Sequence, residues 1–212
     1  MGALVLSALV GWLIGSVPTA YLLVKHRHGL DVSAEGSGNV GANNALRTSG
    51  SKATGALVLF GDALKGAASV GAGWALADTL GADAFMAASL ALLGAIAGHN
   101  FNPWLSLKAG KLAGGKGLAT AAGGFLLLTP WLLLVWGAGF VVGFFGYKAW
   151  KCERDVLPGN VVGTLAVPFA AWAIYGPAAA LVVTVFALLV LPKHVAQMRA
   201  LLSPVSEEGR TT

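Results

Sequence analysis

Long apolar runs constrain this chain more than any other feature of its sequence. They extend from Ala3 to Val24, Thr54 to Leu76, Ala84 to Gly98, Leu118 to Leu128, Trp131 to Tyr147, Val161 to Tyr175 and Ala178 to Leu191. A helix needs about 20 mainly apolar residues to cross the hydrocarbon core of a bilayer. Since 56% of the 212 residues are hydrophobic and only 11% are charged, a water-soluble fold is excluded. The pattern predicts an all-α membrane protein, with a single domain over residues 1–212 built as a bundle of seven transmembrane helices.

Four of these runs are short for a membrane span: those that begin at Ala84, Leu118, Val161 and Ala178. They predict a thin or tilted bundle, or helices that stop midway. The first run lacks a basic start and a clear cleavage site, so we expect a retained helix and not a removable signal peptide.

Positive charges fall between alternate apolar runs. The segments concerned contain Lys25, Arg27, Arg47 and Lys52; Lys108, Lys111 and Lys116; Lys148, Lys151 and Arg154; and Lys193, Arg199 and Arg210. Of the 14 Lys and Arg residues, only Lys65 remains inside a run. Cytoplasmic loops are enriched in these cations, so the pattern predicts an outside N terminus and a cytoplasmic C terminus. The net charge of +5 therefore reflects topology, and no nucleic-acid partner is expected.

The first basic segment is rich in glycine and small polar residues. It reads Gly36-Ser37-Gly38-Asn39-Val40-Gly41-Ala42-Asn43-Asn44, and Arg47 follows. Glycine lets successive backbone N–H groups converge on one anion, and Arg47 adds a permanently charged planar donor. The segment therefore suits phosphate binding, although a flexible linker has a similar composition.

A second anion site is predicted between the third and fourth runs. That segment opens with His99 and ends with Gly114-Gly115-Lys116-Gly117 immediately before an apolar helix. Lys116 thus combines a cation with the positive end of a helix dipole. The alternative is that these lysines serve only as topology signals or as contacts for anionic lipid head groups.

Charged and ionisable residues inside or beside the spans are further candidates. Asp62 and Lys65 are three residues apart on one helical face, either as part of a site or as a structural ion pair. His194 lies just beyond the last run, at the cytoplasmic end of the last span, where it serves as an anion donor or as an ordinary interfacial residue. The single Cys152 supports neither a disulfide nor a metal site, and no metal or cofactor is expected.

These motifs resemble the acyl-phosphate:glycerol-3-phosphate acyltransferase family, PlsY. The resemblance rests on GSGNVGANNALR, DALKG, GH followed by GGKG, and the closing KHVAQMRALL. It implies a seven-span protein of the bacterial plasma membrane, with its active site facing the cytoplasm. It also implies transfer of an acyl group from acyl phosphate to the 1-position of glycerol 3-phosphate, which gives lysophosphatidic acid in the first step of phospholipid synthesis.

The resemblance also assigns roles to individual positions. It implies catalytic roles for Lys116, Ser37, Arg47 and His194, and substrate-binding roles for Gly36, Gly38, Asn39, Gly41, Asn43, Asn44, Asp62, Lys65, His99, Gly114, Gly115, Asn160 and Gln197. The chain departs from the family pattern at Asn43, where the family has Thr, and at Gln197, where it has Asn. An expected S-x-x-S run after the fifth span is replaced by Val156-Leu157-Pro158-Gly159-Asn160.

Acyl phosphate is a mixed anhydride with a good leaving group, so its attack by an alcohol needs orientation and charge stabilisation more than a protein nucleophile. We expect the donor's own phosphate to accept the proton of the attacking hydroxyl. Two alternatives remain: a related acyltransferase with another phosphorylated acceptor, and a small transporter or lipid-phosphate-binding protein in which Asp62 and Lys65 line a path.

Overall fold

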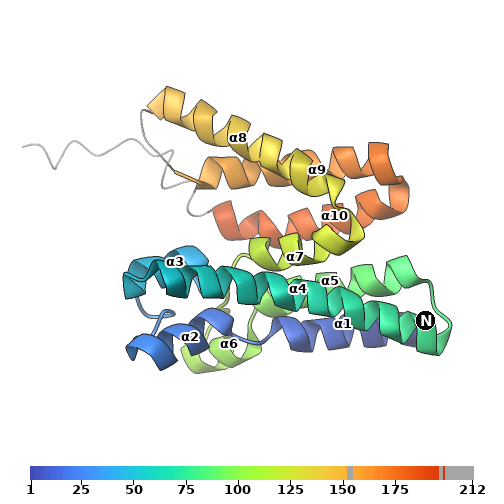
Figure 1. Ribbon diagram of the computed structural model, residues 1–212, viewed down its shortest axis with the longest axis horizontal. Helices are drawn as coiled ribbons and strands as arrows, with labels where there is room; N and C mark the ends of the chain where they lie inside the picture. Colours follow the sequence, from blue (N-terminus) through green and yellow to red (C-terminus); the bar gives the residue numbers. More distant parts are fainter. Residues whose placement is uncertain (152–154, 196–197, 199–212) are drawn as a thin grey trace, which may run out of the picture.

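The computed structural model describes residues 1–151, 155–195 and 198. Within them the secondary structure is entirely helical, which confirms the all-α prediction. The helices are α1 (Gly2–Gly15), α2 (Thr19–His28), α3 (Ala42–Ser49), α4 (Lys52–Leu80), α5 (Ala84–Asn100), α6 (Pro103–Ala109), α7 (Leu118–Leu128), α8 (Trp131–Lys151), α9 (Leu157–Tyr175) and α10 (Pro177–Val190). Figure 1 shows them arranged as an elongated bundle.

Within the part of the chain that the structure describes, six helical stretches are long and apolar enough to cross a membrane. They are Gly2–His28, Lys52–Leu80, Ala84–Ala109, Trp131–Lys151, Leu157–Tyr175 and Pro177–Val195. Three of the four runs that looked short are therefore longer in the structure, because polar or small residues at their ends join the helices. Only α7 remains short, and its 11 residues rise about 16 Å, roughly half the hydrocarbon thickness.

The sequence predicted a single helix over the first apolar run, and the structure shows two helices instead. α1 ends at Gly15 and α2 begins at Thr19. Pro18 lacks an N–H to continue the helical ladder, and its ring disfavours helical geometry at Val17. At the break the Ser16 carbonyl accepts from the Asn102 side chain, and the Val17 carbonyl accepts from both the Thr19 N–H and the Lys65 side chain.

Two groups of long helices make up the bundle. α1, α4 and α5 pack together, α9 packs against α8 and α10, and the short α7 lies mainly against α4 and α5 (Figure 1). α2, α3 and α6 gather at the end of the bundle opposite the N terminus. A Cβ atom on Gly66 would collide with the Thr120 carbonyl oxygen, so glycine allows α4 and α7 to approach closely.

Two apolar clusters fix the parts of the chain that carry polar residues. Phe125 of α7 packs edge-to-face on Phe186 of α10 at a centroid distance of 5.1 Å, inside a cluster that also contains Leu92. In the second cluster, buried Val32 and Val40 hold both sides of the glycine-rich segment against α2 and α4. The segment between these two valines is thereby pinned at its ends.

Candidate functional site

A cavity of about 660 Å³ opens between the helix groups and brings together much of the predicted site. Ten residues singled out from the sequence line it: Ser37, Asn39, Gly41, Asn43, Asn44, Arg47, Asp62, His99, Lys116 and Asn160. They come from five parts of the chain that are far apart in the sequence: the segment 37–47 and the positions of Asp62, His99, Lys116 and Asn160. The two predicted anion-binding loops therefore face a single space and not two separate ones.

The glycine-rich segment turns back on itself beside this cavity. Gly36 and Gly38 have φ angles of +58° and +66°, a backbone conformation that residues with a side chain rarely adopt. The Asn44 Oδ1 atom accepts a hydrogen bond from the Ser37 N–H at 3.0 Å, and its Nδ2 atom donates to the Val32 carbonyl at 2.9 Å. Asn44 is buried, so its amide shapes the loop while the Ser37 side chain stays exposed.

Three helices begin at the cavity. α3 and α7 start after Gly41 and Gly117, which provide no side-chain cap for the first backbone N–H groups. α9 starts beside Asp155, whose Oδ1 atom accepts a hydrogen bond from the Leu157 N–H at 2.7 Å. The N-terminal ends of α3 and α7 carry partial positive charge and exposed donors, so their convergence favours an anion, whereas the Asp155 carboxylate already occupies the start of α9.

Two cationic side chains add positive charge to the cavity. Arg47 lies exposed in the last turn of α3, and Lys116 is half-buried immediately before α7. Burial lowers the pKa of Lys116 from the ordinary lysine value, and the negative charge of Asp155 opposes this shift. A partly desolvated ammonium group attracts an anion more strongly than one in bulk water.

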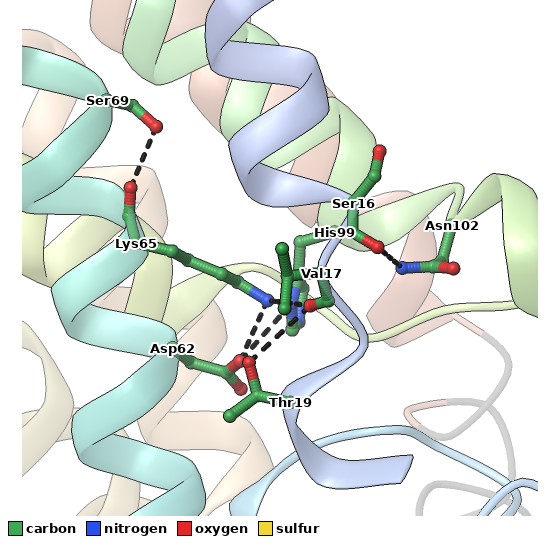
Figure 2. A network of polar contacts seen from close by, with 8 residues as sticks. All are labelled: Ser16, Val17, Thr19, Asp62, Lys65, Ser69, His99 and Asn102. Atoms are coloured by element: carbon green, nitrogen blue, oxygen red, sulfur yellow. Dashed lines mark hydrogen bonds and ion pairs between the residues drawn. The ribbon is translucent and has the colours of Figure 1, made fainter. Parts of the chain in front are cut away.

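A buried polar network forms the wall where α4 and α5 meet the α1–α2 break (Figure 2). The Lys65 Nζ atom lies 2.8 Å from Asp62 Oδ1, 2.8 Å from His99 Nδ1 and 3.1 Å from the Val17 carbonyl oxygen. The Asn102 side chain donates to the Ser16 carbonyl at 2.8 Å. Asp62 and His99 line the cavity, whereas Lys65 lies behind them.

The remaining predicted glycines support the cavity from outside its wall. The Gly115 N–H donates to the His99 carbonyl at 3.0 Å. A Cβ atom on Gly115 would collide with the Nε2 atom of His99, and one on Gly114 would lie 2.5 Å from the Asn100 carbonyl oxygen. These glycines let the loop before α7 lie directly on the end of α5, which places Lys116.

His194 does not line the cavity. It is 1% exposed, and its Nδ1 atom lies 3.0 Å from the Val190 carbonyl oxygen. A carbonyl accepts, so Nδ1 carries the proton, and Nε2 has no hydrogen-bond partner among the described residues. Neutral His194 therefore offers an acceptor and becomes a second donor only when it is protonated. Gln197 and Cys152 lie outside the described residues.

Several cavity residues were not predicted from the sequence. Asp155 is the clearest, and its position two residues before Leu157-Pro158 is typical of a helix start. A separate apolar pocket of about 40 Å³ shares Leu118, Ala122 and Trp136 with the polar cavity. Across residues 1–151, 155–195 and 198, the structure places no three His, Cys, Asp or Glu side chains close enough to hold a metal ion.

Comparison with known proteins places this arrangement in a family. A family model described as glycerol-3-phosphate acyltransferase matches residues 5–204. The chain is 32% identical over 199 residues to a glycerol-3-phosphate acyltransferase of Clostridioides difficile (strain 630), a match that covers 94% of this chain and 92% of the relative. It is 38% identical over 193 residues to the enzyme of the same name from Sinorhizobium medicae (strain WSM419), covering 91% and 86%.

A solved structure agrees with these relatives. The chain superposes with a TM-score of 0.74 on the crystal structure of PlsY (YgiH), an integral membrane glycerol 3-phosphate acyltransferase, in its glycerol 3-phosphate form. The sequences are 26% identical, and the match covers 94% of this chain and 92% of the solved one. The apolar helices, the two converging glycine-rich loops and the extent of these matches show that the chain belongs to the glycerol-3-phosphate acyltransferase family.

Proposed function

We propose that this chain transfers a fatty acyl group from acyl phosphate to the 1-position of glycerol 3-phosphate, giving lysophosphatidic acid. Family membership supports the acceptor and the reaction, and the resemblance to PlsY supports the acyl-phosphate donor. The observation that carries the proposal is the single cavity into which Arg47, Lys116 and the starts of α3 and α7 converge.

The reaction needs two phosphate groups close together, one on the donor and one on the acceptor. In the proposed complex, the Ser37–Gly41 segment and the start of α3 hold one phosphate together with Arg47. Lys116 and the start of α7 hold the other. Charge-assisted hydrogen bonds from a guanidinium or ammonium group are about twice as strong as neutral ones, so these two side chains supply most of the affinity.

Chemistry then follows from the orientation of the substrates. The C1 hydroxyl oxygen of glycerol 3-phosphate forms a bond to the acyl carbonyl carbon, and the bond from that carbon to the bridging phosphate oxygen breaks. The hydroxyl proton passes to the departing phosphate. Lys116 and the α7 N–H groups stabilise the negative charge that develops on that leaving group.

The apolar pocket beside the cavity supports an acyl substrate. Its walls include Phe125, Leu132 and Phe186, and it joins the polar cavity at Leu118, Ala122 and Trp136. We propose that the first methylene groups of the acyl chain lie along this junction, with the phosphate in the polar cavity. The remainder of the chain extends into the bilayer.

A related acyltransferase with a different acceptor remains the second candidate, because the wall at the start of α9 has no serine where the family has its S-x-x-S run and carries Asn160 there, with Asp155 beside it. We propose that these two side chains contact the hydroxyl groups of the acceptor. Dihydroxyacetone phosphate has a carbonyl where glycerol 3-phosphate has its 2-hydroxyl, so its C2 oxygen cannot donate to the Asp155 carboxylate. A preference for this ketone over glycerol 3-phosphate would favour the second candidate.

For topology, we propose seven crossings in the plasma membrane of a bacterium, with the N terminus outside and the C terminus in the cytoplasm. The seventh crossing element is α7 together with the segment that leads into it, because the helix alone covers only about half of the hydrocarbon thickness. Residues 1–212 form one domain. The thirteen cations of the alternate loops support this orientation. Cysteines introduced at Ala82 and Leu112 of a Cys152→Ser protein test it: an impermeant maleimide added to intact cells should label only the first.

Acyl transfer by purified protein tests the proposed function. With palmitoyl phosphate and glycerol 3-phosphate, the wild type should form lysophosphatidic acid, and Lys116→Ala should lose about 100-fold or more in kcat/KM through loss of a charge-assisted contact in the transition state. Lys111→Ala, which removes an exposed cation from the same loop, is the matched control. Undiminished turnover by Lys116→Ala would refute the role of this loop.

A further inference from the structure

Lys65 uses its whole hydrogen-bonding capacity inside the buried network. An ammonium group has three N–H donors, and the structure gives it three acceptors: Asp62 Oδ1, His99 Nδ1 and the Val17 carbonyl oxygen (Figure 2). The side chain is 7% exposed, and Asp62 balances its charge. Lys65 therefore has no donor left for a substrate, and its role has to act through its partners.

The contact with His99 determines which ring nitrogen carries the proton. Charged Lys65 has no acceptor atom, so Nδ1 of His99 has to accept and is unprotonated. The neutral ring then carries its proton on Nε2. That nitrogen lies on the opposite side of the ring, next to Gly115 of the loop that precedes α7, and the His99 side chain lines the cavity.

We propose that Lys65 is a positioning residue that locks His99 as the Nε2–H tautomer, so that a neutral N–H donor faces the cavity beside the Lys116 loop. This inference rests on the proposed function, since the donor is of use only to a phosphate-bearing substrate. The negative charge of Asp62 favours the charged form of Lys65. The Val17 carbonyl, at the α1–α2 break, accepts the hydrogen bond from the third N–H of the Lys65 ammonium group. The Pro18 break thereby contributes to the site by supplying an acceptor.

Nitrogen NMR of the wild-type protein tests the lock without any activity measurement. The chain has four histidines, so a ¹⁵N-histidine-labelled sample is simple enough to assign with His99→Gln and His194→Gln. At pH 7, the Nε2 atom of His99 should be protonated and its Nδ1 atom bare. His194 should show the reverse pattern, because its Nδ1 atom donates to Val190. A proton on Nδ1 of His99 in the wild type would overturn the proposal.

Removal of the lock provides the second test. In Lys65→Met, the Asp62 carboxylate becomes the nearest partner of His99 Nδ1, 3.7 Å away in the wild type, and draws a proton onto it. The Nδ1 signal of His99 should therefore change, while the His194 signal reports whether the fold is retained. Ser69→Ala is the matched control, because Ser69 donates only to the Lys65 backbone carbonyl. An unprotonated Nδ1 in folded Lys65→Met would refute the lock.

Kinetics test whether the locked donor serves a substrate. The amide nitrogen of glutamine reaches the position of Nε2, whereas that of asparagine does not. His99→Gln should therefore stay within a few-fold of wild type, while His99→Asn should raise the KM of a phosphate substrate about 10- to 100-fold with little change in kcat. Equal effects of the two substitutions would assign His99 a structural role only. If the wild type transfers no acyl group at all, the proposed function fails, and the NMR result still decides the lock.

Discussion

Neutralising one member of the buried Asp62–Lys65 pair should destabilise the protein far more than removing both. In Lys65→Met, the carboxylate of Asp62 stays in a position that is 3% exposed. At the 2.8 Å separation and an effective dielectric constant of about 20, the lost attraction is about 6 kcal/mol. Water penetration and relaxation reduce this figure, so we expect a loss of about 3–5 kcal/mol in unfolding free energy.

The double variant Asp62→Leu/Lys65→Met removes the stranded charge. It still leaves the Val17 carbonyl and His99 Nδ1 without the Lys65 donor, which costs about 1–3 kcal/mol. We therefore expect the double variant to be more stable than Lys65→Met by about 2 kcal/mol. The comparison is a double-mutant cycle in which Asp62→Leu completes the square.

Unfolding by SDS in mixed micelles, followed by tryptophan fluorescence, measures these differences, since the chain has seven tryptophans. Leu64→Met is the matched control, because Leu64 lies on the exposed face of the same helix turn. A Lys65→Met protein within 0.5 kcal/mol of wild type, a margin about that of ordinary surface substitutions, would refute the reasoning. So would a double variant that is no more stable than the single one.

Three further predictions concern the cavity. Gly115→Ala should lower the unfolding free energy by about 1–3 kcal/mol and reduce kcat/KM, because its Cβ atom meets the His99 ring. Asp155→Asn should lower the pKa of Lys116 further, so the alkaline limb of the rate profile, where the ammonium loses its charge, should move to lower pH. Ala122→Leu should narrow the junction between the polar and apolar pockets and shift preference towards shorter or thinner acyl chains, as competition between acyl phosphates would show.

The first two of these predictions have a control at a comparable position. Gly137→Ala adds a Cβ atom with nothing within 4 Å inside helix α8, so it should lower neither the unfolding free energy nor the turnover. Asp78→Asn removes an exposed charge from the end of α4 and should not move the alkaline limb. Wild-type behaviour of Gly115→Ala, an alkaline limb that moves to higher pH in Asp155→Asn, or an unchanged chain preference in Ala122→Leu would each contradict the corresponding argument.

Much of the architecture was predictable because membrane spans are set by local apolar length. The all-α membrane class follows from the runs themselves, and both glycine-rich loops were identified by composition and motif. Helix ends were less predictable: Pro18 indicates a break, yet the apolar residues on both sides read as one run. The short α7 is stable against α4 through close glycine contacts that no single-segment pattern contains.

In the site, too, local chemistry was predictable from the sequence, whereas the arrangement in space was not. Arg47 and Lys116 were found because cations among glycines beside helix starts have a recognisable chemistry. Arg47 and Lys116 line the same cavity only because of the way α3 and α7 pack in the bundle, and no local sequence pattern predicts that packing. Asn44 lies in a motif typical of ligand-binding loops, but both ends of its side-chain amide form hydrogen bonds with the backbone of the loop. Asp155 was missed because a single carboxylate before a helix ordinarily indicates a cap.

The measurement that tests the central claim most directly follows the oxygen atom of the acceptor. Purified wild-type protein would receive palmitoyl phosphate and glycerol 3-phosphate carrying ¹⁸O in its C1 hydroxyl, and the products would be identified by mass spectrometry. Attack by that hydroxyl predicts lysophosphatidic acid that retains the label in its ester, together with one unlabelled phosphate per acyl group transferred. Absence of lysophosphatidic acid, or release of the label into phosphate, would contradict the account.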